Sequence, residues 1–153
     1  MRNIVHFLTG NLVLNLCIFS WLIAQVLKVL IYYARKRRLN FHYLLSSGGM
    51  PSSHSSVVCT CAASVGNIAG WSSIEFAIAA IMAFVVMYDA ANVRKAAGEQ
   101  AKILNYIMEH WNEMRPEFLG KELKELLGHT PLQVFAGALL GIAIGLLGTY
   151  LYA

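Results

Sequence analysis

Long runs without charge are the feature that most restricts what this chain can fold into. Charged side chains are absent or rare in four segments, at residues 11–33, 55–71, 74–89 and 131–152. Only 13% of the chain is charged, against roughly 25% in soluble domains. An apolar helix of about twenty residues crosses a bilayer core. We therefore predict an all-α integral-membrane bundle of about four short transmembrane helices, forming a single domain over residues 1–153.

The basic residues predict how this bundle is oriented. Eleven of the twelve Lys and Arg residues lie between Lys28 and Lys124. Four crossings place segments 34–54 and 90–130 on one side, which the positive-inside rule makes cytoplasmic, with both termini on the other side. Aromatic residues do not interleave with the basic run, so the charge indicates membrane topology and acidic lipid, and no nucleic-acid partner is expected.

A polar segment after the third span has the pattern of an amphipathic helix. Apolar or uncharged residues recur there at helical spacing, at Val93, Ala97, Gln100 and Leu104. We expect this cytoplasmic helix to lie on the membrane surface or over the spans, to end at Arg115-Pro116, and to be followed by a further turn or two within 121–127.

Two spans carry small residues at every fourth position. The second span has Ala62, Gly66 and Gly70, and the fourth has Gly137, Gly141 and Gly145. Such stripes let helices approach closely. We predict that the two stripes pack together, while association with a second copy of the chain remains an alternative use for them.

A polar segment at residues 46–56, Ser-Ser-Gly-Gly-Met-Pro-Ser-Ser-His-Ser-Ser, leads into the apolar second span. The first N–H groups of a helix have no intrahelical acceptor and carry partial positive charge, and glycines let a ligand reach the backbone. Together with the serines and His54, these features of the polar segment favour chemistry on a phosphate. The alternative interpretation is a turn followed by a helix cap.

The head of the fourth span repeats this pattern. Gly128-His129-Thr130-Pro131 places a histidine before a good N-cap residue and a proline suited to the first helical position. If the second and fourth spans pack together, two helix starts that carry histidines lie side by side. The cysteines all fall in apolar runs, and we predict no metal site.

These motifs together resemble a known family. Lys28 and Arg35, then Pro51-Ser52-Ser53-His54, then His129 resemble the three-part signature of the type 2 phosphatidic acid phosphatase and vanadium haloperoxidase superfamily. Three segments are similar to its small divergent bacterial and plant branch: Gly-Gly-Met-Pro-Ser-Ser-His-Ser-Ser, residues 89–101, and Leu127-Gly128-His129-Thr130-Pro131. The resemblance covers nearly the whole chain.

The resemblance implies an enzyme that hydrolyses a lipid-linked phosphate or diphosphate at the cytoplasmic face of a bacterial plasma membrane or plastid-type membrane. It implies that His129 is the nucleophile and His54 the general acid, without a metal or other cofactor. The phosphate would be held by Lys28, Arg35, Gly49, Ser52 and Ser53. For Lys28, snorkelling to the interface is the alternative role.

Three positions depart from the family pattern. Lys36 replaces a proline, Leu123 an arginine, and Gln133 the aspartate that would orient His129. Gln133 can do part of that orienting. Arg94 and Asp89 are candidates for the missing cation and acid, or else form a pair that caps the third span. The departures motivate a second hypothesis, a non-catalytic membrane protein whose pocket binds phosphorylated headgroups or partners.

Overall fold

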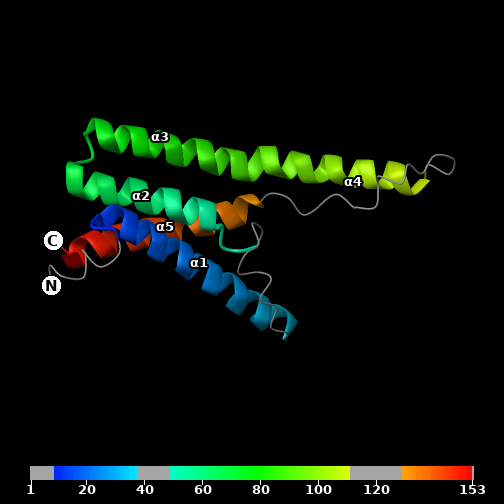
Figure 1. Ribbon diagram of the computed structural model, residues 1–153, viewed down its shortest axis with the longest axis horizontal. Coiled ribbons are helices and arrows are strands. Elements are labelled where there is room, and N and C mark those ends of the chain that lie inside the picture. Colours follow the sequence, from blue (N-terminus) through cyan, green and yellow to red (C-terminus); the bar gives the residue numbers. More distant parts are fainter. Residues whose placement is uncertain (1–8, 38–48, 111–128, 153) are drawn as a thin grey trace.

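The computed structural model describes residues 9–37, 49–110 and 129–152, and this part of the chain is helical without strands (Figure 1). Its elements are α1 (Leu12–Lys36), α2 (Ser53–Ala69), α3 (Ile74–Tyr88), the π-helical turn η3 (Asp89–Val93), α4 (Arg94–His110) and α5 (Pro131–Tyr152). The predicted all-α class is therefore confirmed.

The helix ends follow local capping chemistry. Asn11, Ser52 and Ser73 are the N-caps of the first three helices, and each side chain accepts a bond from a first-turn backbone N–H. Gly70 ends α2 with a φ of 98°, which favours glycine. These caps explain why the helix ends lie within a few residues of the predicted span limits.

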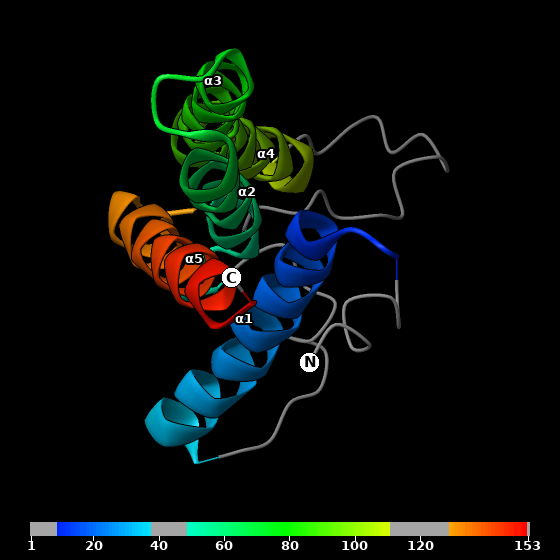
Figure 2. The ribbon, with the colours of Figure 1, turned by 90° about the vertical axis from the view of Figure 1, so that its left-hand side faces the viewer.

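The helices alternate in direction, and α2 lies at the centre of the bundle. In Figure 1, α1 and α3 run one way while α2 and α5 run the other way. Figure 2 shows α2 lying between α1, α3 and α5, all of which it contacts. Three helices of the described chain are long and apolar enough to cross a membrane: α1, the continuous helix 74–108, and α5.

The fourth predicted crossing corresponds to α2, which has 17 residues and a polar composition. Both α1 and α3 start at the same end of the bundle (Figure 1), so the chain must return through α2 between them. Seventeen helical residues span about 25 Å. Neighbouring helices cover the hydroxyl-bearing face of α2, and we therefore keep the prediction of four crossings.

The glycine face of α5 packs on α2, but on a different stripe from the predicted one. A Cβ on Gly137 or Gly141 would collide with the backbone carbonyls of Ser52 and Ser56, respectively. Gly66, in contrast, faces the rings of Trp71 and Phe76. The prediction that α5 docks on Ala62, Gly66 and Gly70 is therefore wrong.

The physical reason for this arrangement is hydrogen bonding. The α2 face toward α5 carries hydroxyls, and the single Thr60 hydroxyl proton is shared between the carbonyl of Ser56 in its own helix, at 2.8 Å, and that of Gly141, at 3.0 Å. On the α1 side, the Ser20 and Ser56 hydroxyls are 2.6 Å apart. In lipid, polar groups have to find partners inside the protein, so α2 turns its hydroxyls inward and leaves the Gly66 face to α3.

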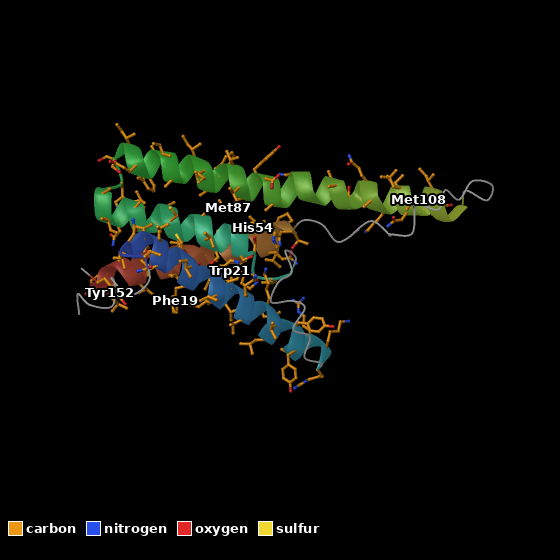
Figure 3. The ribbon with its side chains drawn as sticks, viewed as in Figure 1. Phe19, Trp21, His54, Met87, Met108 and Tyr152 are labelled. Atoms are coloured by element: carbon orange, nitrogen blue, oxygen red, sulfur yellow. The ribbon has the colours of Figure 1, made fainter. Side chains whose placement is uncertain are left out.

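Helix α4 continues the line of α3 through η3 and extends beyond the ends of the other helices (Figures 1 and 3). The predicted helix is present, but it lies beyond the spans instead of over them, so the second of the two positions expected for it is wrong. A position on the membrane surface stays a prediction. No Gly or Pro interrupts Asp89–Val93, so the chain has no local reason to turn there. The expected break at Arg115-Pro116 and the turns within 121–127 lie outside the described residues.

Candidate active site

The starts of α2 and α5 meet at one end of the bundle and bring the two histidines together. The backbone N–H of Ser52 donates to the carbonyl of Gln133 at 3.0 Å, which joins the two helix starts directly. The rings of His54 and His129 lie with their centroids 6.0 Å apart and their planes at 61°. Figure 3 labels His54 on the first turn of α2, beside the start of α5. One phosphate group can reach both rings at this separation.

His129 is held by its backbone and by its ring. Only 2% of the residue is exposed. Its backbone N–H donates to the carbonyl of Ala90 in η3 at 3.0 Å. Its ring Nδ1 lies 3.3 Å from the Oε1 of Gln133, which also accepts the backbone N–H of Thr130 at 3.1 Å.

The bonds of Gln133 define the tautomer of His129. A backbone N–H can only donate, so the Gln133 atom facing Thr130 is the amide oxygen. The same oxygen accepts from Nδ1, which must then carry the proton. The neutral ring therefore has its lone pair on Nε2, which is buried. Gln133 thus supplies part of what the family's aspartate would supply.

Gln133 also has a structural role. Thr130 and Gln133 form a capping box at the start of α5, because the Gln133 N–H points to the Thr130 Oγ1 at 3.4 Å while the Gln133 Oε1 bonds back to the Thr130 N–H. Thr130 and Pro131 occupy the N-cap and the first helical position, as predicted.

Histidine ¹⁵N NMR tests the tautomer. We expect wild-type His129 to show the Nδ1–H form, and Gln133→Leu to shift it toward the Nε2–H form, because leucine offers no acceptor to Nδ1. Gln133→Glu keeps an oxygen at that place and should keep the Nδ1–H form, which makes it the matched control. An Nε2–H signal for His129 in the wild type contradicts this assignment.

A buried lysine lies beside the start of α2. Lys28 is 2% exposed, and its Nζ donates to the Oγ of Ser53 at 3.1 Å. The side chain therefore points into the protein instead of snorkelling. A buried ammonium group is costly without an anion or other polar partners, and its charge adds to the positive end of α2. This arrangement can attract and hold a phosphate.

The other predicted phosphate ligands are placed differently. The Ser52 hydroxyl caps α2, accepting from the N–H and hydroxyl of Ser55 at 3.3 and 3.0 Å, and its own N–H is bonded to Gln133. Gly49 lies half-buried in the turn before α2, with a φ of 98°. Arg35 is exposed on the last turn of α1, seven residues or about 10 Å along the helix from Lys28. Their roles in phosphate binding stay predictions.

The candidate replacements for the missing arginine and aspartate lie on the long helix. Asp89 is half-buried in η3, directly before the residue whose carbonyl holds His129. Arg94 begins α4, and its side chain lies outside the described part, as does Leu123. The described residues contain no group of three or more His, Cys, Asp and Glu side chains that could hold a metal ion.

Sequence reasoning missed the carbonyl of Ala90. Ala90 offers no functional side chain, and a backbone carbonyl in the middle of a helix normally bonds within that helix. Neither a residue type nor a spacing indicates the π turn that brings it to His129, so the sequence carries no readable signal for this contact.

The fold and these contacts define a membrane-embedded helical bundle with two histidines and a buried lysine at adjoining helix starts. The chain belongs to the Divergent PAP2 family, whose model matches residues 9–144. It is 40% identical over 139 residues to the uncharacterized membrane protein YuiD of Bacillus subtilis (strain 168), covering 84% of this chain and 88% of that protein. No solved structure matches the chain.

Proposed function

We propose that this membrane protein is a phosphatase that hydrolyses a lipid-linked phosphate or diphosphate through a histidine nucleophile. The observation that carries the proposal is the 6.0 Å separation of the His54 and His129 rings at two adjoining helix starts. The Nδ1–H tautomer of His129 supports it, because that form leaves the Nε2 lone pair to attack phosphorus.

The proposed reaction has two steps. In the first, Nε2 of His129 attacks the terminal phosphorus, the bond from that phosphorus to the leaving oxygen breaks, and protonated His54 gives its proton to this oxygen. A phosphohistidine forms, together with a lipid alcohol from a monophosphate or a lipid monophosphate from a diphosphate. In the second, water attacks the phosphohistidine while His54 takes a proton from the water, and phosphate leaves. Lys28 and the first N–H groups of α2 stabilise the charge on the phosphoryl oxygens.

The position of the site favours a lipid substrate. The histidines lie at one end of a bundle whose outer surface is apolar, with exposed residues such as Phe19 and Trp21 on α1. A phosphate at that end would lie at headgroup depth while its acyl or prenyl tail remained in the bilayer. From the basic residues we propose that this end faces the cytoplasm and that both termini lie on the other side.

Phosphate release by the purified protein in lipid nanodiscs tests the proposal. Phosphatidate, phosphatidylglycerophosphate, polyprenyl phosphate and polyprenyl diphosphate form the substrate panel. We expect the wild type to release phosphate from at least one of them, and the double variant His54→Ala, His129→Ala to lose at least 10³-fold of that rate, because both the nucleophile and the general acid are removed. Equal rates for wild type and double variant would refute a histidine mechanism.

A second candidate function is phosphate binding without turnover. The observation that favours it is the capping box of Gln133, which explains this residue without any catalytic role. A neutral amide also stabilises an imidazolium less well than a carboxylate does. This function requires that the wild type binds a phosphorylated headgroup but releases phosphate no faster than the double histidine variant.

A further inference from the structure

The π-helical turn η3 lies where the long helix passes the site. It interrupts the continuous helix 74–108 at Asp89–Val93, between α3 and α4. The segment contains neither Gly nor Pro, and its alanines are good helix formers, so local sequence does not explain why the regular α pattern is lost. The cause of the π turn therefore lies in the residues that η3 contacts.

The contact that η3 makes is with His129. The Ala90 carbonyl accepts the His129 backbone N–H at 3.0 Å, and Ala90 is only 1% exposed. His129 precedes Thr130, the N-cap of α5, so its N–H cannot bond within α5 and needs an acceptor from elsewhere. The small side chain of Ala90 leaves room for the backbone at His129 to approach η3.

A π turn provides such an acceptor. Its bonds join residues five apart instead of four, so the turn holds one residue more than an α turn and its peptide groups shift away from regular positions. At the entry to the turn, the Asp89 N–H is still shared between the carbonyls of Val85 and Val86, four and three residues back, so this N–H makes no π bond. A carbonyl displaced in this way can bond to a donor outside its own helix.

We propose that η3 is a positioning element of the site: through the Ala90 carbonyl it holds the backbone of His129 and so sets the distance between the His129 and His54 rings. The catalytic consequence rests on the proposed function, but the placement of the rings does not. Ala90 acts through His129, and the π turn holds one residue more than a regular α turn, which deletion of Ala91 would remove.

Deletion of Ala91 from the full-length chain in nanodiscs tests this role. The deletion should restore a regular α turn and remove the Ala90 carbonyl from His129. Deletion of Ala97, which is exposed on α4, is the matched control, because it shortens the same helix by one residue outside the π turn. Circular dichroism and the thermal midpoint establish that each variant folds.

Two measurements separate positioning from general damage. In ¹⁵N-histidine NMR, the Ala91 deletion should shift the His129 ring signals and abolish the cross-peaks between the two histidine rings, while the Ala97 deletion leaves both as in the wild type. In the phosphatase assay, kcat should fall at least 100-fold with KM within threefold for the Ala91 deletion, because small misplacements of reacting groups are costly.

The outcomes distinguish this proposal from the proposed function. Unchanged His129 signals and ring contacts in a folded Ala91 deletion overturn the positioning role, whatever the activity. Lost ring contacts in a protein whose wild type shows no turnover support the positioning role and refute the phosphatase. If the deletion variant does not fold, Ala90→Val replaces it, since a branched side chain at this buried place should displace the same contact. Unchanged signals in that variant also overturn the proposal.

Discussion

A His54→Gln variant should release nitrophenolate from p-nitrophenyl phosphate almost as fast as the wild type in the first turnover, while losing about 10²- to 10⁴-fold on lipid phosphates. The reason is the proposed proton donation by His54. An alkyl oxygen leaves poorly unless it is protonated, whereas a nitrophenolate leaves without a proton. First-turnover release of nitrophenolate and of the lipid product, measured on the same preparation, gives the comparison, because His54 also serves as the base in the later hydrolysis of the phosphohistidine.

The matching variant is His129→Gln, which removes the proposed nucleophile. It should lose at least 10³-fold on both kinds of substrate and form no acid-labile phosphoenzyme, because no leaving group compensates for the missing nitrogen. If the two variants lose rate equally on both substrates, His54 is not the general acid. If His54→Gln alone loses the first-turnover release of nitrophenolate, the two roles are reversed.

A Gly141→Ala variant should be strongly destabilised. The added methyl group would collide with the carbonyl of Ser56 and lie 3.0 Å from the Cβ of Cys59, and neither atom can move without shifting α2. Overpacking of this kind costs about 1–3 kcal/mol, more than the roughly 0.5–1 kcal/mol that alanine gains over glycine in a helix. We expect the thermal midpoint in detergent to fall by about 3–10 °C.

Gly148→Ala is the control on the same helix. The three atoms nearest to its methyl group would all belong to the buried Leu16 side chain, so a side chain has to give way instead of a helix backbone. Its thermal midpoint should fall by less than that of Gly141→Ala. A Gly141→Ala midpoint as high as that of Gly148→Ala would show that α5 does not pack on α2 through this glycine face.

The helices and the meeting of the histidines could be predicted from the sequence because both depend on local features. Uncharged runs define the helices, and serine, threonine, glycine and proline define their ends. His54 and His129 lie next to such ends, at Ser52 and Thr130, on helices that run in the same direction. Once these helices pack together, their starts must lie at the same end of the bundle.

Other features depend on interactions that spacing does not reveal. A regular repeat on α2 pointed to Gly66, but the hydroxyl face with Thr60 packs on α5, where the Thr60 hydroxyl reaches the carbonyl of Gly141 in addition to that of Ser56. The amphipathic pattern of α4 showed a helix but not its direction. That direction depends on η3. Its π form occurs together with the hydrogen bond from the His129 N–H to the Ala90 carbonyl, and these two residues are 39 positions apart in the sequence.

The dependence of α2 on α5 has a consequence for synthesis. Ribosomes make the chain from the N-terminus, so α2 is complete while α5, at Pro131–Tyr152, does not yet exist. Until then the carbonyl of Gly141 cannot receive the Thr60 hydroxyl, and the N–H of Ser52 lacks its acceptor on Gln133. A nascent chain that stops before α5 therefore cannot hold the beginning of α2 in its final place. The imidazole rings of His54 and His129 come together only after α5 has been synthesised.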